Sequence, residues 1–218
     1  MTAAPVTAAA LREKGDAIAL EGVAETLTYR RLAARAEAVA DALTSMGIVA
    51  GDRVALLSRV RGHDEAVGLM GVLSAGAVAV PVDPASPPAR QAKIMAGCRA
   101  LIHDGKPAVL DGDDDPLLHI ELDQDGLVLA SAGHPPEDGP RDARLACVLH
   151  TSGSTGAPKP VPITWEGLTA FCQWMTDLVD LRPSDRVLRV AELTFDLAWF
   201  DHVATLLAGA TLLTMTRR

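Results

Sequence analysis

Apolar residues along this chain fall into two alternating patterns, short unbroken runs and stripes with helical spacing. From Thr28 to Met46 the apolar positions recur every three or four residues, which places them on one face of a helix that Thr28 can cap. Gly47 follows, where a glycine commonly ends a helix. The next run, residues 54–57, is short and wholly apolar, as in a strand buried on both faces.

The same alternation continues along most of the chain. It predicts helices after Asp64, at 88–97, around 168–178 and at 197–208, and strands at 77–80, 100–102, 145–149, 186–190 and 211–215. Alternating strands and helices favour an α/β fold with a mostly parallel, doubly wound sheet and helices on both faces. Residues 104–143 lack this pattern, and we expect an irregular insertion or linker there with one strand at 117–122.

One uncharged run, residues 66–82, is long enough to raise the question of a membrane span. A spanning helix needs about 20 apolar residues, and glycines and Pro81 interrupt this run. A buried helix followed by a buried strand is favoured, with no membrane association. The first ten residues lack the basic start of a signal peptide. Three cysteines in no metal-ligand spacing favour reduced thiols in a cytoplasmic protein.

The charge balance excludes one large class of partner. The formal net charge is −8, whereas nucleic-acid binding needs clustered Lys and Arg, so no nucleic-acid partner is expected. Four aspartates gather at 111–115. Such a cluster can bind a divalent ion, but a solvated loop is favoured. The histidines and cysteines show no ligand spacing, so no protein-held metal site is expected.

The segment from His150 to Lys159 has the composition of a phosphate-binding loop. Two glycines, four hydroxyl residues and a lysine follow an apolar run, and glycines let backbone N–H groups converge on an anion. The spacing differs from a Walker A loop, in which the lysine directly follows the second glycine. A Ser/Thr/Gly surface turn has the same composition, so this motif alone leaves both interpretations open.

Four blocks in order resemble the acyl-adenylate-forming enzymes, in particular the adenylation domains of nonribosomal peptide synthetases. The blocks are LTY at 27–29 with GDRVAL at 51–56, LSAGA at 73–77 with VPVDP at 80–84, TSGSTGAPK at 151–159, and FD at 195–196 with LLAGATL at 206–212. The resemblance covers nearly the whole chain and favours the phosphate loop over the surface turn. It implies that residues 1–218 form the N-terminal portion of an adenylation domain.

The resemblance implies ATP-dependent activation of an amino acid carboxylate as aminoacyl-AMP, followed by transfer to a carrier-protein thiol on phosphopantetheine. Magnesium is implied as the ion that accompanies ATP. Lys159 is implied as the catalytic residue that meets the leaving pyrophosphate. The residues implied to wrap the phosphates are Thr151, Ser152, Gly153, Ser154, Thr155 and Gly156.

The fourth block carries the implied substrate contacts. In amino-acid-activating members an aspartate at the place of Asp196 pairs with the substrate's α-ammonium group. The alternative is a simple helix cap, and the two roles can coexist on two oxygens. Leu197 and Phe200 match side-chain pocket positions of the family, although both also suit the core of the predicted helix.

The chain also departs from the family. Pro160 stands where a glycine usually follows the lysine, Trp165 replaces a common histidine, and Ala198 replaces a common serine. The family's adenine-binding segment and its C-terminal subdomain with a catalytic lysine have no counterpart. We therefore expect the chain to work with the remainder of an adenylation domain as a second polypeptide. The alternatives are an inactive adenylation-like binding module or a fragment of an aryl or acyl acid CoA ligase.

Overall fold

Two mixed β-sheets organise this computed structural model, which describes residues 6–23, 25–58, 62–104, 117–122, 128–131, 139–152 and 157–214. Seven strands form one sheet in the order β7-β6-β5-β3-β4-β8-β9. Their bounds are β3 Arg53–Leu57, β4 Val78–Pro81, β5 Ala100–His103, β6 Leu118–Leu122, β7 Val128–Ser131, β8 Leu145–Ser152 and β9 Pro158–Thr164. The second sheet has the order β10-β11-β1-β2, with β1 Ile18–Glu21, β2 Thr26–Thr28, β10 Arg186–Leu188 and β11 Thr211–Leu213.

The seven-stranded sheet is parallel at its centre. Strand β3 pairs in parallel with both β4 and β5, and β4 pairs in parallel with β8. The chain leaves β3 through helix α3 (His63–Ser74) to β4 on one side, and crosses through α4 (Pro88–Met95) to β5 on the other side. This reversal is a topological switch point, beside which open α/β sheets bind ligands at the carboxyl ends of their strands.

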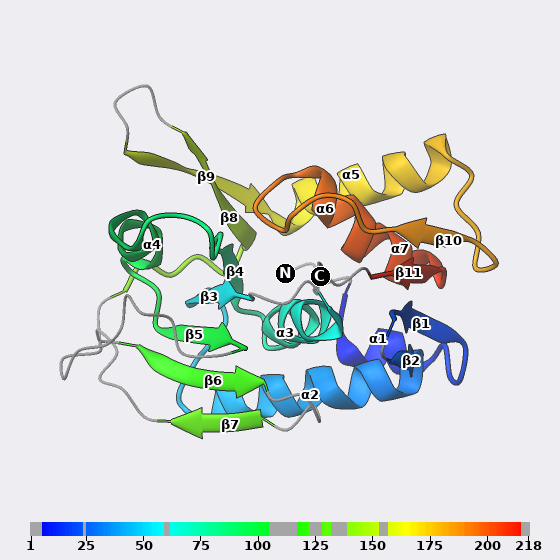
Figure 1. Ribbon diagram of the computed structural model, residues 1–218, viewed down its shortest axis with the longest axis horizontal. Helices are drawn as coiled ribbons and strands as arrows, with labels where there is room; N and C mark the ends of the chain where they lie inside the picture. The colour runs from blue at the N-terminus through cyan, green and yellow to red at the C-terminus, as the bar shows by residue number, and fades with distance from the viewer. Residues whose placement is uncertain are drawn as a thin grey trace.

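Helices cover both faces of this sheet, which confirms the predicted α/β arrangement. Along β3, Val54 and Leu56 belong to the main core, whereas Ala55 and Leu57 belong to a second apolar cluster that includes Ile94 of α4. The main core holds α3 and α2 (Tyr29–Ser45), with α1 (Ala8–Arg12) beside them. Figure 1 shows α3 between the seven-stranded sheet and the four-stranded sheet.

Helices α2 and α3 pack closely because a glycine faces the neighbouring helix. A Cβ built on Gly71 of α3 would lie 2.5 Å from Val39 Cβ of α2, so no larger residue fits there without movement. Helix α2 begins as predicted, since Thr28 Oγ1 accepts a hydrogen bond of 3.3 Å from the N–H of Arg31. This helix pair therefore forms a rigid layer between the two sheets.

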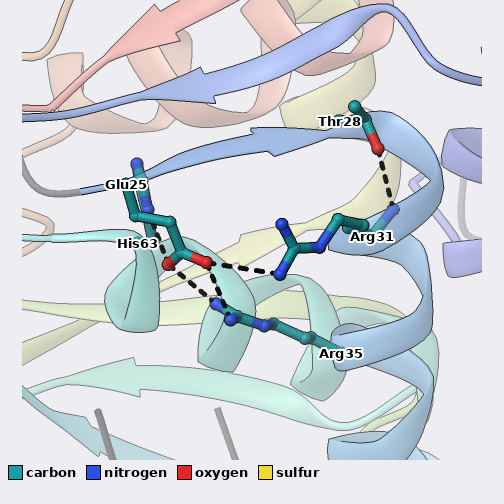
Figure 2. Close-up of polar contacts among 5 residues, drawn as sticks. All are labelled: Glu25, Thr28, Arg31, Arg35 and His63. Carbon is teal, nitrogen blue, oxygen red and sulfur yellow. Dashed lines mark hydrogen bonds and ion pairs between the residues drawn. The ribbon is translucent and has the colours of Figure 1, made fainter. Parts of the chain in front are cut away.

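A polar cluster around Glu25 fixes the start of α3 (Figure 2). The Glu25 carboxylate accepts two hydrogen bonds from Arg35 of α2 and lies 3.3 Å from Nδ1 of His63, the first residue of α3. Arg31 contributes a second cation at 3.6 Å. Burial alone would raise the pKa of Glu25, but the bonds to Arg35 and His63 lower it. The cluster thus joins β2, α2 and α3 at one point.

Most predicted elements are confirmed, whereas helix α1 and strands β1 and β2 were not predicted and three further details differ. The expected strand at 117–122 is β6, but a further strand, β7, lies in the same segment. A strand that was not predicted, β9, precedes helix α5 (Trp165–Leu178). The predicted helix at 197–208 is divided into α6 (Leu197–Trp199), a π-helical turn (Phe200–Ala204) and α7 (Thr205–Ala208).

Strand β11 lies inside its sheet, because it pairs with β1 on one side and with β10 on the other. Gly209 ends the preceding helix with φ +82, a left-handed conformation that favours glycine.

Cys98, Cys147 and Cys172 are all buried free thiols, and burial raises the pKa of Cys98 and Cys172 to about 12. In the described ranges, every helix is too short or too polar to cross a bilayer.

Candidate functional site

A cavity of about 580 Å³ lies at the carboxyl ends of β4 and β8. Three parts of the chain form its walls: the β8–β9 hairpin, the segment from β4 into α4, and the segment that follows β10. Its lining residues are Pro81, Asp83, Ser86, Arg90, Ile94, Leu149, His150, Thr151, Val161, Ile163, Glu192, Thr194, Phe195 and Asp196. The start of the predicted phosphate loop and the predicted amine anchor therefore share one cavity.

The phosphate loop is described only at its two ends. Gly153, Ser154, Thr155 and Gly156 lie outside the described residues, and so does the side chain of Ser152. Thr151 of β8 pairs directly with Lys159 of β9, and both side chains are exposed. Directly opposed residues in an antiparallel pair have Cβ atoms about 5 Å apart. Lys159 does not line the cavity itself, but its strand register places it beside Thr151, which does.

Asp196 stands at the cavity mouth and also begins a helix. Its side chain is exposed, and Oδ1 accepts a hydrogen bond of 2.8 Å from the N–H of Leu197. Within the described part of the chain, Oδ2 has no hydrogen-bond partner. The cap and a ligand contact are thus compatible, because each uses a different oxygen.

The two predicted pocket residues lie away from the cavity. The Leu197 side chain is 58% exposed, and Phe200 is half-buried and packs against the main core. Trp199, between them, is buried and donates a hydrogen bond of 3.1 Å to the carbonyl of Leu193. Through this bond the Trp199 side chain holds the segment before Asp196 in place. The substrate role of Leu197 and Phe200 stays a prediction.

Arg90 and His150 line the cavity, although neither was predicted as a site residue. Arg90 of α4 brings a permanent cation to the wall, and no motif in its helix singled it out. His150 is half-buried there, and burial together with the charges of Arg53 and Arg90 lowers its pKa, which favours the neutral ring. The positive charge of this wall at neutral pH therefore comes from Arg90.

A second cavity of about 280 Å³ lies beside the first one, at the ends of β3 and β5. Pro81, Asp83, Glu192 and Thr194 line both cavities, so these residues form the wall between them. No three His, Cys, Asp or Glu side chains gather as metal ligands among the residues that the structure describes. The four aspartates at 111–115 lie outside those residues.

Comparison with known proteins agrees with the geometry of this site. The family model of the AMP-binding enzymes matches residues 7–218. Pyochelin synthetase PchE of Pseudomonas aeruginosa is 36% identical over 200 residues, which cover 92% of this chain and 13% of that protein. L-proline–[L-prolyl-carrier protein] ligase of Streptomyces coelicolor is 34% identical over 210 residues, which cover 85% of this chain and 39% of that protein. The chain thus spans well under half the length of these relatives.

Solved structures give the same result. The N-terminal subdomain of Klebsiella oxytoca NpsA, in complex with 3-hydroxybenzoyl-AMSN, superimposes with a TM-score of 0.75 at 26% identity, over 99% of this chain and 54% of that one. MatB of Rhodopseudomonas palustris has a TM-score of 0.79 over 98% of this chain and 45% of that one, and at 22% identity it supports the fold alone. The chain therefore belongs to the AMP-binding enzyme family and corresponds to the N-terminal part of the adenylate-forming fold.

Proposed function

We propose that this chain supplies the nucleotide- and amino-acid-binding face of an enzyme that converts an amino acid and ATP into aminoacyl-AMP and pyrophosphate. The aminoacyl group then passes to the phosphopantetheine thiol of a carrier protein. The observation that carries this proposal is the cavity that Thr151 and Asp196 share. Because the chain spans only part of its relatives, we propose that a C-terminal portion, with the adenine and ribose contacts, completes the enzyme.

The nucleotide binds on the hairpin side of the cavity. The loop from Thr151 to Gly156 offers backbone N–H groups and hydroxyls to the phosphates, and Lys159 offers a mobile cation to the departing pyrophosphate. Arg90 of α4 adds a second cation to the cavity lining. Mg²⁺ accompanying ATP would neutralise part of the phosphate charge.

The amino acid binds on the side of Asp196. Its α-ammonium group pairs with the Asp196 oxygen that the helix cap does not use, and its carboxylate then points toward the hairpin. A carboxylate oxygen can attack the α-phosphate only if both substrates are held together, which the shared cavity permits. The proline ligase of Streptomyces coelicolor supports an amino acid as the substrate class.

A second candidate is the activation of an acid without an amine. The NpsA subdomain, at 26% identity, was solved with a 3-hydroxybenzoyl ligand, which lacks the α-amine. An exposed carboxylate at Asp196 would repel the carboxylate of such a substrate without a compensating ion pair. Asp196 therefore favours the amino acid.

Pyrophosphate exchange tests the proposal. The chain is mixed with the C-terminal remainder of the Streptomyces coelicolor proline ligase, and amino-acid-dependent ATP–pyrophosphate exchange is measured for all common amino acids. We expect exchange with at least one of them, and a loss of about 100-fold in Lys159→Ala. Lys93→Ala is the matched control, since Lys93 is an exposed lysine of α4 that does not line the cavity. Exchange that is equal in both variants would remove Lys159 from the mechanism.

A further inference from the structure

The segment that carries Asp196 has little regular structure of its own. After β10, residues 189–196 form turns until α6 begins. Backbone bonds hold its two ends: the N–H of Arg189 donates to Leu213 at 3.0 Å, and the N–H of Phe195 donates to Glu192 at 2.8 Å. The position of Asp196 therefore depends on side chains that fasten this segment to the layers beneath it.

One such side chain is a buried arginine. Arg189 is 3% exposed, and its guanidinium pairs with the carboxylate of Glu65, which is 9% exposed. Glu65 lies in the first turn of α3, which the Glu25 cluster fixes at His63 (Figure 2). The pair thus joins the end of the four-stranded sheet to the helix layer. Neither the proposed chemistry nor a sequence motif uses it.

The arginine has a second neighbour on the other side of Asp196. His202 is fully buried in the π-helical turn, and its Nδ1 lies 2.8 Å from the carbonyl of Ala198. Burial and the charge of Arg189 lower the pKa of His202 to about 4, so the neutral ring donates from Nδ1. Asp201, beside it, accepts a hydrogen bond from the N–H of Val190. Arg189 and Val190, which precede Asp196, are therefore linked to His202 and Asp201, which follow it.

The pair also lies against the cavity wall. Glu65 and Arg189 line the smaller cavity, and Glu192 and Thr194 line both cavities. The wall that separates the two cavities thus has the ion pair on one side and Asp196 on the other. A shift of Arg189 would move this wall, because the main chain from Arg189 to Asp196 is continuous.

We propose that Glu65 and Arg189 are positioning residues, whose buried ion pair fastens residues 189–196 to α3 and thereby sets the place of the Asp196 carboxylate in the cavity. The functional part of this proposal rests on the proposed role of Asp196 as the amine anchor. A buried charge can stay in place only while its counter-charge is beside it, so this ion pair restricts where residue 189 can lie relative to α3.

Hydrogen exchange measured by mass spectrometry tests the positioning directly. In Glu65→Gln and Arg189→Gln we expect amides of residues 189–199 to exchange at least about tenfold faster, because each change removes the buried ion pair between the segment and α3. Amides of α2 serve as the reference for intact folding. Arg186→Gln is the matched control, since Arg186 is three positions away on β10, is exposed and pairs with exposed Glu21. Unchanged exchange in residues 189–199 would overturn the proposal.

A double variant separates positioning from bulk stability. Glu65→Met/Arg189→Met replaces the pair by apolar side chains, which commonly restores stability at buried ion pairs. We expect its thermal midpoint to return to the wild-type value while residues 189–199 still exchange faster. If their protection returns together with the midpoint, the pair contributes stability alone and the proposal fails.

Ligand discrimination separates this proposal from the proposed function. The chain is mixed with the C-terminal portion used for pyrophosphate exchange, and the probes are the sulfamoyl-adenosine of the amino acid that gives the strongest exchange and its counterpart without the amine. The readout is the ratio of their dissociation constants. We expect this ratio to be about 10- to 100-fold smaller in the double variant, because small displacements of a binding group commonly have effects of this size. A wild-type chain without any amine preference would contradict the role of Asp196, and the exchange result would still decide whether Glu65 and Arg189 position the segment.

Discussion

The substitution Asp196→Asn isolates the charge of the proposed amine anchor from its structural role. Asparagine keeps a side-chain oxygen that accepts the 2.8 Å bond from Leu197, and it caps helices about as well as aspartate. We therefore expect the free energy of unfolding to change by no more than about 0.5 kcal/mol. What the variant loses is the negative charge that faces the cavity.

The expected loss of affinity follows from the exposure of this carboxylate. Two unit charges 4 Å apart attract by about 1 kcal/mol in water and by about 4 kcal/mol near a protein surface. Asp196 is exposed and lies at the edge of a cavity that a ligand would fill, so we take about 1 to 3 kcal/mol. Since 1.4 kcal/mol is tenfold, the amine-bearing ligand should bind about 5- to 150-fold more weakly.

Calorimetric titration provides the assay. With the C-terminal portion present, the sulfamoyl-adenosine of the amino acid that gives the strongest exchange is compared with its counterpart that lacks the amine, and only the first should lose affinity. Asp177→Asn is the control, because Asp177 is an exposed aspartate of α5 that accepts a hydrogen bond from Gln173 far from the cavity. If Asp196→Asn weakens both ligands equally, or neither, the carboxylate does not recognise the amine and the reasoning is refuted.

Three further predictions concern stability. Thr28→Ala removes the cap of α2 and should lower the free energy of unfolding by about 1 kcal/mol in urea titrations, while Thr28→Ser should change it little. Gly71→Ala sets a methyl group against Val39 and should cost about 1 to 3 kcal/mol, more than Gly68→Ala, whose nearest neighbour is 3.3 Å away; equal costs would contradict tight packing of the two helices. The pKa of His202 is about 4 when folded and about 6.5 when unfolded, so between these values the unfolded chain binds more protons and stability falls as the pH falls. His202→Gln should flatten this dependence, and a wild-type slope in the variant would contradict a buried neutral ring.

The elements that sequence patterns predict well are those set by local physics. Helix α2 carries a side-chain cap, a regular apolar stripe and a terminal glycine, and its bounds agree with the prediction to within a residue or two. Strand β9 was not predicted, and Pro160 and Pro162 argue against a strand because neither has an N–H group to donate. These prolines are tolerated because β9 is an edge strand, where a residue without an N–H group leaves no partner unpaired.

The features that sequence patterns missed depend on contacts between distant residues. The division into two sheets rests on the pairing of β1 with β11, which joins the two ends of the described chain. The place of Arg90 in the cavity and the pairing of Glu65 with Arg189 depend on the packing of whole layers. The resemblance to a family indicated the roles of Thr151 and Asp196, but only the fold places them in one cavity.

The candidate site belongs to both sheets at once. The β8–β9 hairpin extends from the seven-stranded sheet, whereas Asp196 follows β10 of the four-stranded sheet. The distance between the phosphate side and the amine side of the cavity is therefore set by the helix layer between the sheets. Glu65 lies on that layer and Arg189 lies at the end of β10, so their ion pair spans the junction that determines this distance. The site crosses this junction, so its geometry depends on the contacts that hold the junction together. The buried ion pair of Glu65 and Arg189 is one of these contacts, and this role can offset its desolvation cost.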